Sequence, residues 1–419
     1  MSSAFSIALS SLQANSDAIT TTGNNLANLN TTGFKSSNID FQTLVSEQLG
    51  GGGAQGQYGL GVASPINQQI FSQGTLQSST SPLSAAIQGN GFFVVNDSKN
   101  QQLYTRDGDF TLNSSGVLQT QGGQNVQGWM ATQTGINTTG APGNIVIPTG
   151  TVLAPQATKN FSINANLDSS AIAGSANGIF SQPMTVVDSL GSQHQLTVNF
   201  TKSATANQWT YQVTIPSQDV GGPAGSQTDL LASPGTINFN TDGSMSTAGG
   251  TAPVALSIGG LSDGAANLGI NWNVFNGGVG SLTQYGQASA PAALSQDGSA
   301  GAQFTGVSIQ SGGQIAATFS NGQQKVVGQL AMAAIQNPET LENVGGNNFT
   351  AGVGTATPAL GVPQTGGRGQ IMGSSLEGSN VDMATSFTNL IIYQRGYQAS
   401  SKVITTADQM SQDLLQLIH

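Results

Sequence analysis

The side chains that most often carry out chemistry in proteins are scarce in this chain. Its 419 residues include no cysteine, two histidines and 7% charged residues. Zinc sites of the usual kinds need clustered cysteine or histidine ligands, and a nucleophilic side chain needs a base close to it. His194 and His419 are far apart in the sequence, so neither arrangement is indicated. We therefore predict a protein that is not an enzyme, with no catalytic residue, no cofactor and no metal ligand.

Three short patterns suggest binding chemistry, and each has a simpler interpretation. Asp107 and Asp109 flank a glycine as in a calcium loop, but the ligand spacing fails after Asp109, which favours a turn. Gly59-Leu60-Gly61 lacks the third glycine, the preceding strand and the following helix of a dinucleotide-binding loop. His194 lies between two expected strands and is predicted to be a turn or edge residue.

Charge and hydropathy exclude two classes of partner. The net charge is −10, and the nine lysines and arginines are scattered from Lys35 to Lys402, whereas a nucleic-acid-binding protein carries a basic patch. No apolar stretch approaches the roughly 18 residues that a membrane helix needs. The first twenty residues lack the basic start and apolar core of a secretory signal. We expect no nucleic acid, no membrane insertion, and, if the protein is extracellular, export without a cleaved signal peptide.

The elements that could position a functional surface lie at the two ends of the chain. Apolar residues follow heptad spacing over about 3–28, diluted by Ser16 and Gly23, and again over the last forty residues. Ser379 or Asn380 can cap the second helix, with Asp382 near its positive end. The predicted seam consists of Phe5, Leu9, Leu12, Ile19, Leu26, Met383, Leu390, Tyr393, Tyr397, Ile404, Leu414 and Ile418.

Two such helices need partners, because a single amphipathic helix is barely stable in water. Pairing the two ends in a coiled-coil-like arrangement would cover part of each apolar stripe. An ordinary helical bundle is the alternative, but no other helical pattern of comparable length exists to complete one. The surface that remains would be covered by further copies of the same chain, which predicts assembly.

Between the helices the pattern changes to short strands and turns. Residues 31–73 form a glycine-rich connecting segment, expected to be loop-like, and about 74–375 is rich in β-strand signals. Asp107-Gly108 predicts a hairpin turn, as does the run 188–191, and 113–116 predicts a further turn. Trp129 and Trp209 are expected in the core or at a domain junction. The predicted fold class is α+β, with terminal helices and mainly-β middle domains.

Three motifs resemble those of the flagellar rod and hook family. The first spans 23–35 and the second combines 89–95 with 104–110, followed by Gln127-Gly128-Trp129. The third combines 376–382 with 393–398. The positions that carry the first motif are Asn24, Asn25, Leu26, Ala27, Asn28, Thr32, Gly33, Phe34 and Lys35. Gly23 and Gly396 stand where the family more often has alanine and asparagine, which is expected to lower helix stability.

The length and the middle of the chain resemble the hook members of this family more than the shorter rod members. The resemblance implies a nested architecture: 1–30 with 376–419 as a helical inner domain, 74–150 with 281–375 as an inner β domain, and 151–280 as an inserted outer β domain. It also implies a structural subunit that polymerises into a hollow, bendable tube transmitting motor torque to the filament.

The same resemblance implies partners and a location. The partners would be further copies of the chain, the distal rod, the hook cap, the hook–filament junction protein and the flagellar type III export apparatus. The location would be the extracellular flagellum, at the hook of the basal body. Two alternatives stay open at this point: a distal rod subunit, and a secreted acidic β-rich adhesin or binding module.

Overall fold

The computed structural model describes residues 2–44, 47–48, 57–58, 61–132 and 135–417. The chain packs into two compact units. The first consists of Met1–Thr149, Gly306–Thr318 and Gln324–His419, and the second of Gly150–Thr305 and Phe319–Gln323. Within the described residues, no helix has the length and apolar character needed to cross a membrane.

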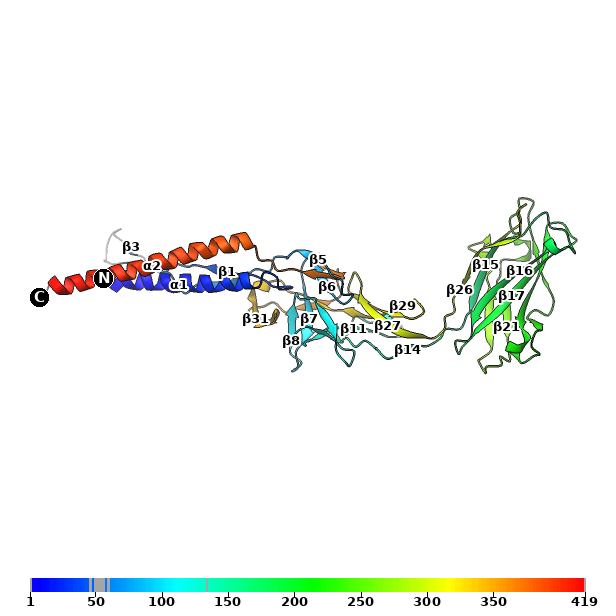
Figure 1. The fold of residues 1–419 in the computed structure, drawn as a ribbon, viewed down its shortest axis with the longest axis horizontal. Helices are drawn as coiled ribbons and strands as arrows, with labels where there is room; N and C mark the ends of the chain where they lie inside the picture. Colours follow the sequence, from blue (N-terminus) through cyan, green and yellow to red (C-terminus); the bar gives the residue numbers. More distant parts are fainter. Residues whose placement is uncertain (1, 45–46, 49–56, 59–60, 133–134, 418–419) are drawn as a thin grey trace. The chain divides into compact units, whose positions relative to one another are not determined.

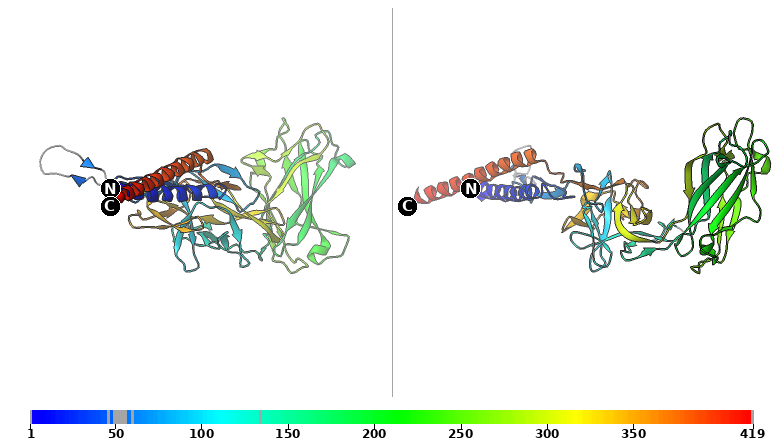
Figure 2. Two further views of the ribbon diagram at one scale, coloured as in Figure 1. Left: turned by 60° about the vertical axis from the view of Figure 1, so that its left-hand side comes forward. Right: turned by 45° about the vertical axis from the view of Figure 1, so that its right-hand side comes forward.

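The first unit begins and ends with the two long helices that the sequence predicts. α1 (Ser2–Ala27) and α2 (Met383–Leu417) lie side by side along much of their length, as Figures 1 and 2 show from different directions. The side chain that caps α2 differs from the two we expected: Asp382 Oδ1 accepts the Thr385 amide at 2.6 Å. Asn380 is not free to cap, because its amide accepts from Ser36 N at 2.7 Å and donates to Ile70 O at 2.7 Å.

The segment 31–73 contains more regular structure than a connecting loop. Its strands β1 (Ser37–Asp40) and β4 (Ile66–Gln69) pair antiparallel, with Ser37 opposite Gln69. A shorter pair joins β2 (Glu47–Gln48) to β3 (Gln57–Tyr58). Gly50–Gly53, Gly56 and the Gly59-Leu60 part of the rejected dinucleotide pattern lie outside the described residues.

Strands from opposite ends of the sequence pair next to the helices. β5 (Leu76–Ser78) pairs with β35 (Ser375–Glu377), and β6 (Ala85–Gln88) pairs with β34 (Gln370–Gly373). These pairings bring the second and third sequence motifs together. The chain therefore closes on itself before α2 begins.

The larger sheet of the first unit runs in the order β27-β28-β29-β11-β7-β8-β32-β31. One core under it contains Phe92, Tyr104, Trp129 and Phe349, which places Trp129 in a core as predicted. The strands of this region are β7 (Phe92–Asn96), β8 (Gln102–Thr105), β9 (Phe110–Leu112), β10 (Leu118–Thr120), β11 (Asn125–Thr132), β12 (Gly135–Ile136), β13 (Gly143–Asn144), β27 (Ala302–Ile309), β28 (Gln314–Phe319), β29 (Gln324–Leu330), β30 (Met332–Ala334), β31 (Leu341–Gly345), β32 (Asn348–Ala351) and β33 (Ala359–Gly361).

One predicted hairpin is wrong and its neighbour is confirmed. β8 pairs with β7 and β32, whereas β9 pairs with β10, so Asp107-Gly108 joins strands that are not paired with each other. The reason is a long-range contact: Gly108 O accepts the Ala85 amide at 2.9 Å and draws the chain away from β8. The turn at 113–116 does form a hairpin, with Leu112 opposite Leu118.

The second unit is a pair of β-sheets that share one core. One sheet contains β16-β17-β18-β19 with β20, and the other contains β21-β22-β15-β25 with β26. Trp209 and Trp272 are fully buried between them, which places Trp209 in a core as predicted. The strands are β14 (Val152–Leu153), β15 (Asn160–Asn166), β16 (Ile179–Val187), β17 (Gln193–Lys202), β18 (Gln208–Pro216), β19 (Gln227–Asp229), β20 (Gly235–Asn238), β21 (Val254–Ile258), β22 (Leu268–Trp272), β23 (Phe275–Asn276), β24 (Val279–Gly280), β25 (Leu282–Thr283) and β26 (Ala290–Gln296).

The hairpin at 188–191 forms as predicted, with Val187 opposite Gln193. The second unit also takes in 281–305, which the sequence assigned to the inner β domain, because β25 and β26 both pair with β15. The structure therefore has the α+β class that was predicted, with paired terminal helices and a mainly-β middle.

Candidate functional site

The contact between α1 and α2 is lined by small side chains. Ala14 and Ala18 are fully buried on α1, and Ser11 Oγ lies 2.9 Å from Ser400 Oγ on α2. A Cβ at Gly396 would lie 2.6 Å from the Asn15 side-chain oxygen, so glycine at this position allows the close approach. Small residues at these positions allow the two backbones to approach each other closely.

None of the predicted seam residues whose burial the structure describes is fully buried. Leu12, Ile19, Leu26, Leu390, Tyr393 and Ile404 are half-buried, and Phe5, Leu9, Met383 and Tyr397 are exposed. Tyr393 packs against Phe41, with ring centroids 5.9 Å apart. Leu414 lies in α2, and Ile418 lies outside the described residues.

Several exposed apolar residues on α2 were not among the predicted site residues. Ile391 and Ile392 are 51% and 57% exposed, and Phe387, Val403 and Met410 are exposed as well. The sequence signal for Ile391 and Ile392 was their adjacency, because two neighbouring residues cannot both lie on one narrow helical stripe. Together with Phe5 and Leu9 of α1, these are apolar side chains of the helix pair that this single chain leaves uncovered, and we call these seven residues together the outer helix face.

The first motif ends α1 and fixes the chain that follows it. Asn25 is buried and bonds reciprocally to the backbone of Ser37: Nδ2 donates to the carbonyl at 2.7 Å and Oδ1 accepts the amide at 3.0 Å. Asn28 Nδ2 donates to Asn24 O at 2.9 Å. Thr32 O accepts from Asn347 Nδ2 at 2.8 Å. Leu26 is half-buried, Ala27 is exposed and Phe34 is buried.

Gly33 is the position of this motif at which the structure most clearly requires glycine. Its φ is +67°, and a Cβ there would lie 2.6 Å from Asp107 N and 2.7 Å from Arg106 C. Its amide donates to Glu377 O at 2.8 Å. Glycine therefore permits both the left-handed backbone and the close passage of the second and third motifs.

These motifs meet in a buried ion cluster of Lys35, Arg106 and Glu377. Lys35 Nζ lies 2.7 Å from Glu377 Oε1, and Arg106 Nη1 lies 3.1 Å from Glu377 Oε2. The side chains of Lys35 and Glu377 are 0% exposed and that of Arg106 is 5% exposed. We call these three residues the junction cluster, because they connect the segment after α1, the end of β8 in the larger sheet and the strand β35 that precedes α2.

Hydrogen bonds complete the junction cluster. Lys35 Nζ donates to Ser72 O at 2.8 Å, Glu377 Oε1 accepts the Gly74 amide at 2.9 Å, and Arg106 Nη2 donates to Gly89 O at 2.8 Å. Burial lowers the pKa of Lys35 and of Arg106, while Glu377 acts in the opposite direction on both. Both bases depend on Glu377, because removing this carboxylate would leave two desolvated cations unpaired.

Of these three residues, only Lys35 was predicted from the sequence, as a motif position; Arg106 and Glu377 were not selected as site residues. Both lie within the second and third motifs. Because only 7% of the residues are charged, a charged residue inside a motif could have been selected as a candidate site residue. The sequence does not show that the three residues contact one another.

Protein-family models match four parts of the chain. They are described as flagellar basal body rod protein (5–35), flagellar hook protein FlgE/F/G D1 domain (86–166), flagellar basal body protein FlaE D2 domain (156–299) and flagellar basal body rod FlgEFG protein C-terminal (372–417). The four matches lie at both ends and in the middle of the chain and leave 36–85 and 300–371 unmatched. They include both helices and both β units.

Two relatives that match over nearly their whole length are both flagellar hook proteins. The flagellar hook protein FlgE of Treponema pallidum is 32% identical over 457 residues, covering 98% of each chain. That of Salmonella typhimurium is 30% identical over 424 residues, covering 99% of each. The crystal structure of Helicobacter pylori FlgE2 matches 71% of this chain at 15% identity, with a TM-score of 0.48. On the sequence relationships, this chain belongs to the family of flagellar hook proteins.

Proposed function

We propose that this hook subunit polymerises through the outer helix face, with the helix pairs of neighbouring copies covering one another. The observation that supports the proposal is the contrast between the side chains inside the contact of α1 with α2 and those outside it. Small residues line the contact within the chain, whereas Phe5, Leu9, Ile391 and Ile392 remain about half exposed. Repeated contacts between different surfaces of identical subunits build an open helical assembly when the rotation from one subunit to the next does not close into a ring.

The finer functional assignments belong to the same proposal. The role is structural and not catalytic, and the tube bends while it transmits torque. The subunit contacts the distal rod, the hook cap and the hook–filament junction protein, and reaches its place through the flagellar type III export apparatus without a cleaved signal peptide. Family membership is the support for these assignments.

The test is the double substitution Ile391→Ser/Ile392→Ser in the full chain. Each side chain is about half exposed, so covering it contributes about 1 to 1.5 kcal/mol. Losing both raises the critical concentration for polymerisation roughly 30- to 150-fold. The measurement is sedimentation of polymer over a concentration series, with electron microscopy to show tubes.

Ile172→Ser/Ile179→Ser is the matched control, since both of these isoleucines are exposed in the second unit. It should polymerise at the concentration of the unmodified chain. If the α2 variant also polymerises at that concentration, subunits do not join through the outer helix face.

A further inference from the structure

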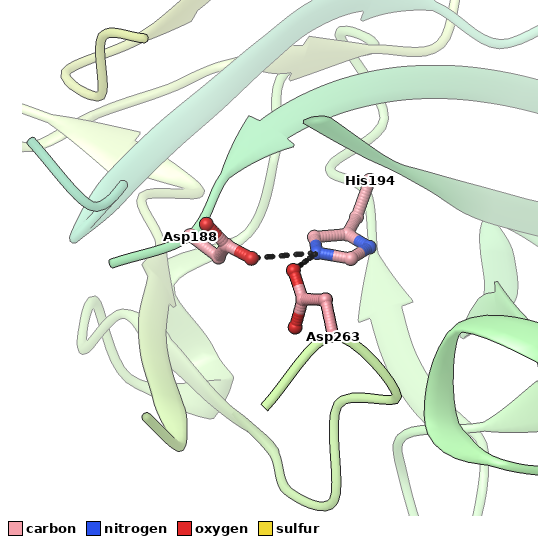
Figure 3. Close-up of side chains that lie close together, drawn as sticks. All are labelled: Asp188, His194 and Asp263. Carbon is pink, nitrogen blue, oxygen red and sulfur yellow. Dashed lines mark hydrogen bonds and ion pairs between the residues drawn. The ribbon is translucent and has the colours of Figure 1, made fainter. Parts of the chain in front are cut away.

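A histidine in the second unit is surrounded by three carboxylates. His194 Nε2 lies 3.1 Å from Asp188 Oδ2 and 3.9 Å from Asp263 Oδ2, as Figure 3 shows. Its other ring nitrogen, Nδ1, lies 3.1 Å from Asp219 Oδ2. His194 does not lie in the turn, as one of the two predicted placements had it, but in β17 opposite Val186, and its side chain is 7% exposed.

The strand pattern explains why the histidine points inward. Along β17, Leu196, Val198 and Phe200 are buried and alternate with more exposed polar residues. His194 shares their period of two and therefore faces the same side of the sheet. The alternation was present in the sequence, and it would have placed this imidazole on the core side.

Hydrogen bonds from backbone amides orient the carboxylates of Asp188 and Asp263. Asp188 Oδ1 accepts the amides of Leu190 and Ser192 at 2.8 and 2.9 Å, which leaves Oδ2 directed at His194. Asp263 Oδ1 accepts the Ala265 amide at 3.0 Å, and its Oδ2 is likewise the atom nearest the ring. Each carboxylate thus has one oxygen fixed by a loop and one oxygen at the centre of the group.

The loop that carries Asp263 is itself attached on two sides. Ser262 Oγ donates to Gln218 O at 2.8 Å, in the short helix η2 (Ser217–Val220) that also holds Asp219. Ala266 N donates to Ser189 Oγ at 3.0 Å, next to Asp188. The four side chains are therefore brought together by three separate segments that bond to one another.

The carboxylates around the ring need a positive charge, which either a second proton on the imidazole or a metal ion in place of that proton can supply. Burial acts to lower the pKa of His194, but its hydrogen bonds to Asp188 and Asp219 outweigh this effect and raise the pKa. A neutral imidazole has one N–H and one lone pair, so it can donate to one carboxylate only. If Nδ1–H donates to Asp219, the lone pair of Nε2 faces the oxygens of Asp188 and Asp263. Among the described residues, the ion pairs of these three carboxylates run only to His194, so no lysine or arginine supplies the missing charge.

We propose that Asp188, His194 and Asp263 bind a divalent transition-metal ion of the Zn²⁺ class, with Asp219 as the residue that orients the imidazole. The three ligand atoms lie within 4.8 Å of one another. Around a tetrahedral zinc, ligand atoms are about 3.4 Å apart, given metal–ligand distances of about 2.1 Å. A carboxylate on the far ring nitrogen is the usual second partner of a metal-bound histidine.

The donor set selects the class of ion. Calcium and magnesium prefer oxygen ligands only, whereas an imidazole with carboxylates suits zinc and its transition-metal neighbours. Asp188 and His194 are buried, and the Asp263 side chain is 29% exposed, so an ion can enter past Asp263 and keep a water ligand. The bound ion would connect the 188–194 hairpin to the β21–β22 loop, and so link the two sheets.

The experiment uses the full chain after treatment with a chelator. We expect one equivalent of Zn²⁺ to bind in calorimetry, Co²⁺ to give the visible absorption of a four-coordinate site, and Zn²⁺ to raise the melting temperature of the second unit. Asp263→Asn should weaken binding at least 10-fold, and Asp219→Asn should weaken it about 10- to 100-fold without removing a ligand. Calcium in excess should not displace the ion.

Asp242→Asn is the matched control. Asp242 and Asp263 are both exposed, both precede a glycine with positive φ, and both accept the amide two residues later. The control should bind as the unmodified chain does. The proposal is overturned if the unmodified chain binds no Zn²⁺ at submillimolar concentration, or if Asp263→Asn binds it with unchanged affinity. Because Asp263 is exposed, this variant is expected to fold, and calorimetric melting of the second unit verifies that.

Discussion

The ammonium group of Lys35 lies 2.7 Å from the carboxylate of Glu377, although 342 positions separate the two residues in the chain. Arg106 binds the second oxygen of the same carboxylate. One acid therefore neutralises two bases inside the first unit, at the place where the helix pair joins the inner sheet. Because Glu377 is the partner of both bases, we expect it to contribute more to the stability of the first unit than Lys35 or Arg106 does.

Glu377→Gln is expected to be the most damaging substitution in the junction cluster. It leaves two buried cations without a counter-ion, which costs about 3 to 5 kcal/mol. Lys35→Met should cost less, because the pair between Arg106 and Glu377 remains. Differential scanning calorimetry should show a lower melting temperature for the first unit and an unchanged one for the second.

The control for this experiment is Glu342→Gln, which changes the same charge at an exposed position of β31. It should leave both melting transitions in place. Equal effects of the substitutions at 342 and 377 would mean that the ion cluster contributes nothing particular to the first unit.

The two unusual helix glycines are expected to respond oppositely to the same substitution. A Cβ added at Gly23 would have no neighbouring atom within 4 Å, so Gly23→Gln should stabilise α1 by about 0.8 kcal/mol. A Cβ at Gly396 would lie 2.6 Å from the Asn15 side-chain oxygen, so Gly396→Gln should displace the Asn15 side chain, which donates to Ser11 O, and weaken the contact between the helices. The measurement is the temperature at which assembled protein loses its helical circular-dichroism signal. A rise for both variants would show that the close contact at Gly396 does not matter.

The stability of the first unit is expected to depend on the protonation of Asp107. Burial raises the pKa of this carboxyl from its ordinary value of 3.8 to about 6. The folded chain thus holds a proton more tightly than the unfolded chain, and stability from this group falls as the pH rises from about 4 to about 6. The loss amounts to at most roughly 3 kcal/mol and stays constant above that range.

Asp107→Asn tests this dependence, because the amide can still accept the Asp109 N–H that Asp107 Oδ1 accepts at 3.1 Å. The variant should be more stable than the unmodified chain at pH 7 and lose this advantage at pH 4. Urea unfolding of the first unit across that range measures the difference. Asp40→Asn, at an exposed position of β1, controls for the change in net charge and should give a difference that does not vary with pH.

The sequence by itself determined the helices and turns that depend on residues close together in the chain. Heptad spacing predicted both terminal helices, and the turns at 113–116 and 188–191 were predicted from residues that lie next to one another. The α+β class followed from those elements. The three motifs carried the family resemblance because they are continuous stretches whose residue types can be compared directly.

Only the tertiary structure decided which of these elements meet. Asp107-Gly108 has the composition of a hairpin turn, yet the hydrogen bond from Ala85 draws that segment to a different strand. Lys35, Arg106 and Glu377 form one cluster because β5 pairs with β35, a contact between opposite ends of the chain. His194 gains its carboxylates from segments up to 69 positions away, from Asp263 back to His194. Such contacts depend on the folded path of the whole chain, so the secondary-structure propensity of neighbouring residues cannot predict them.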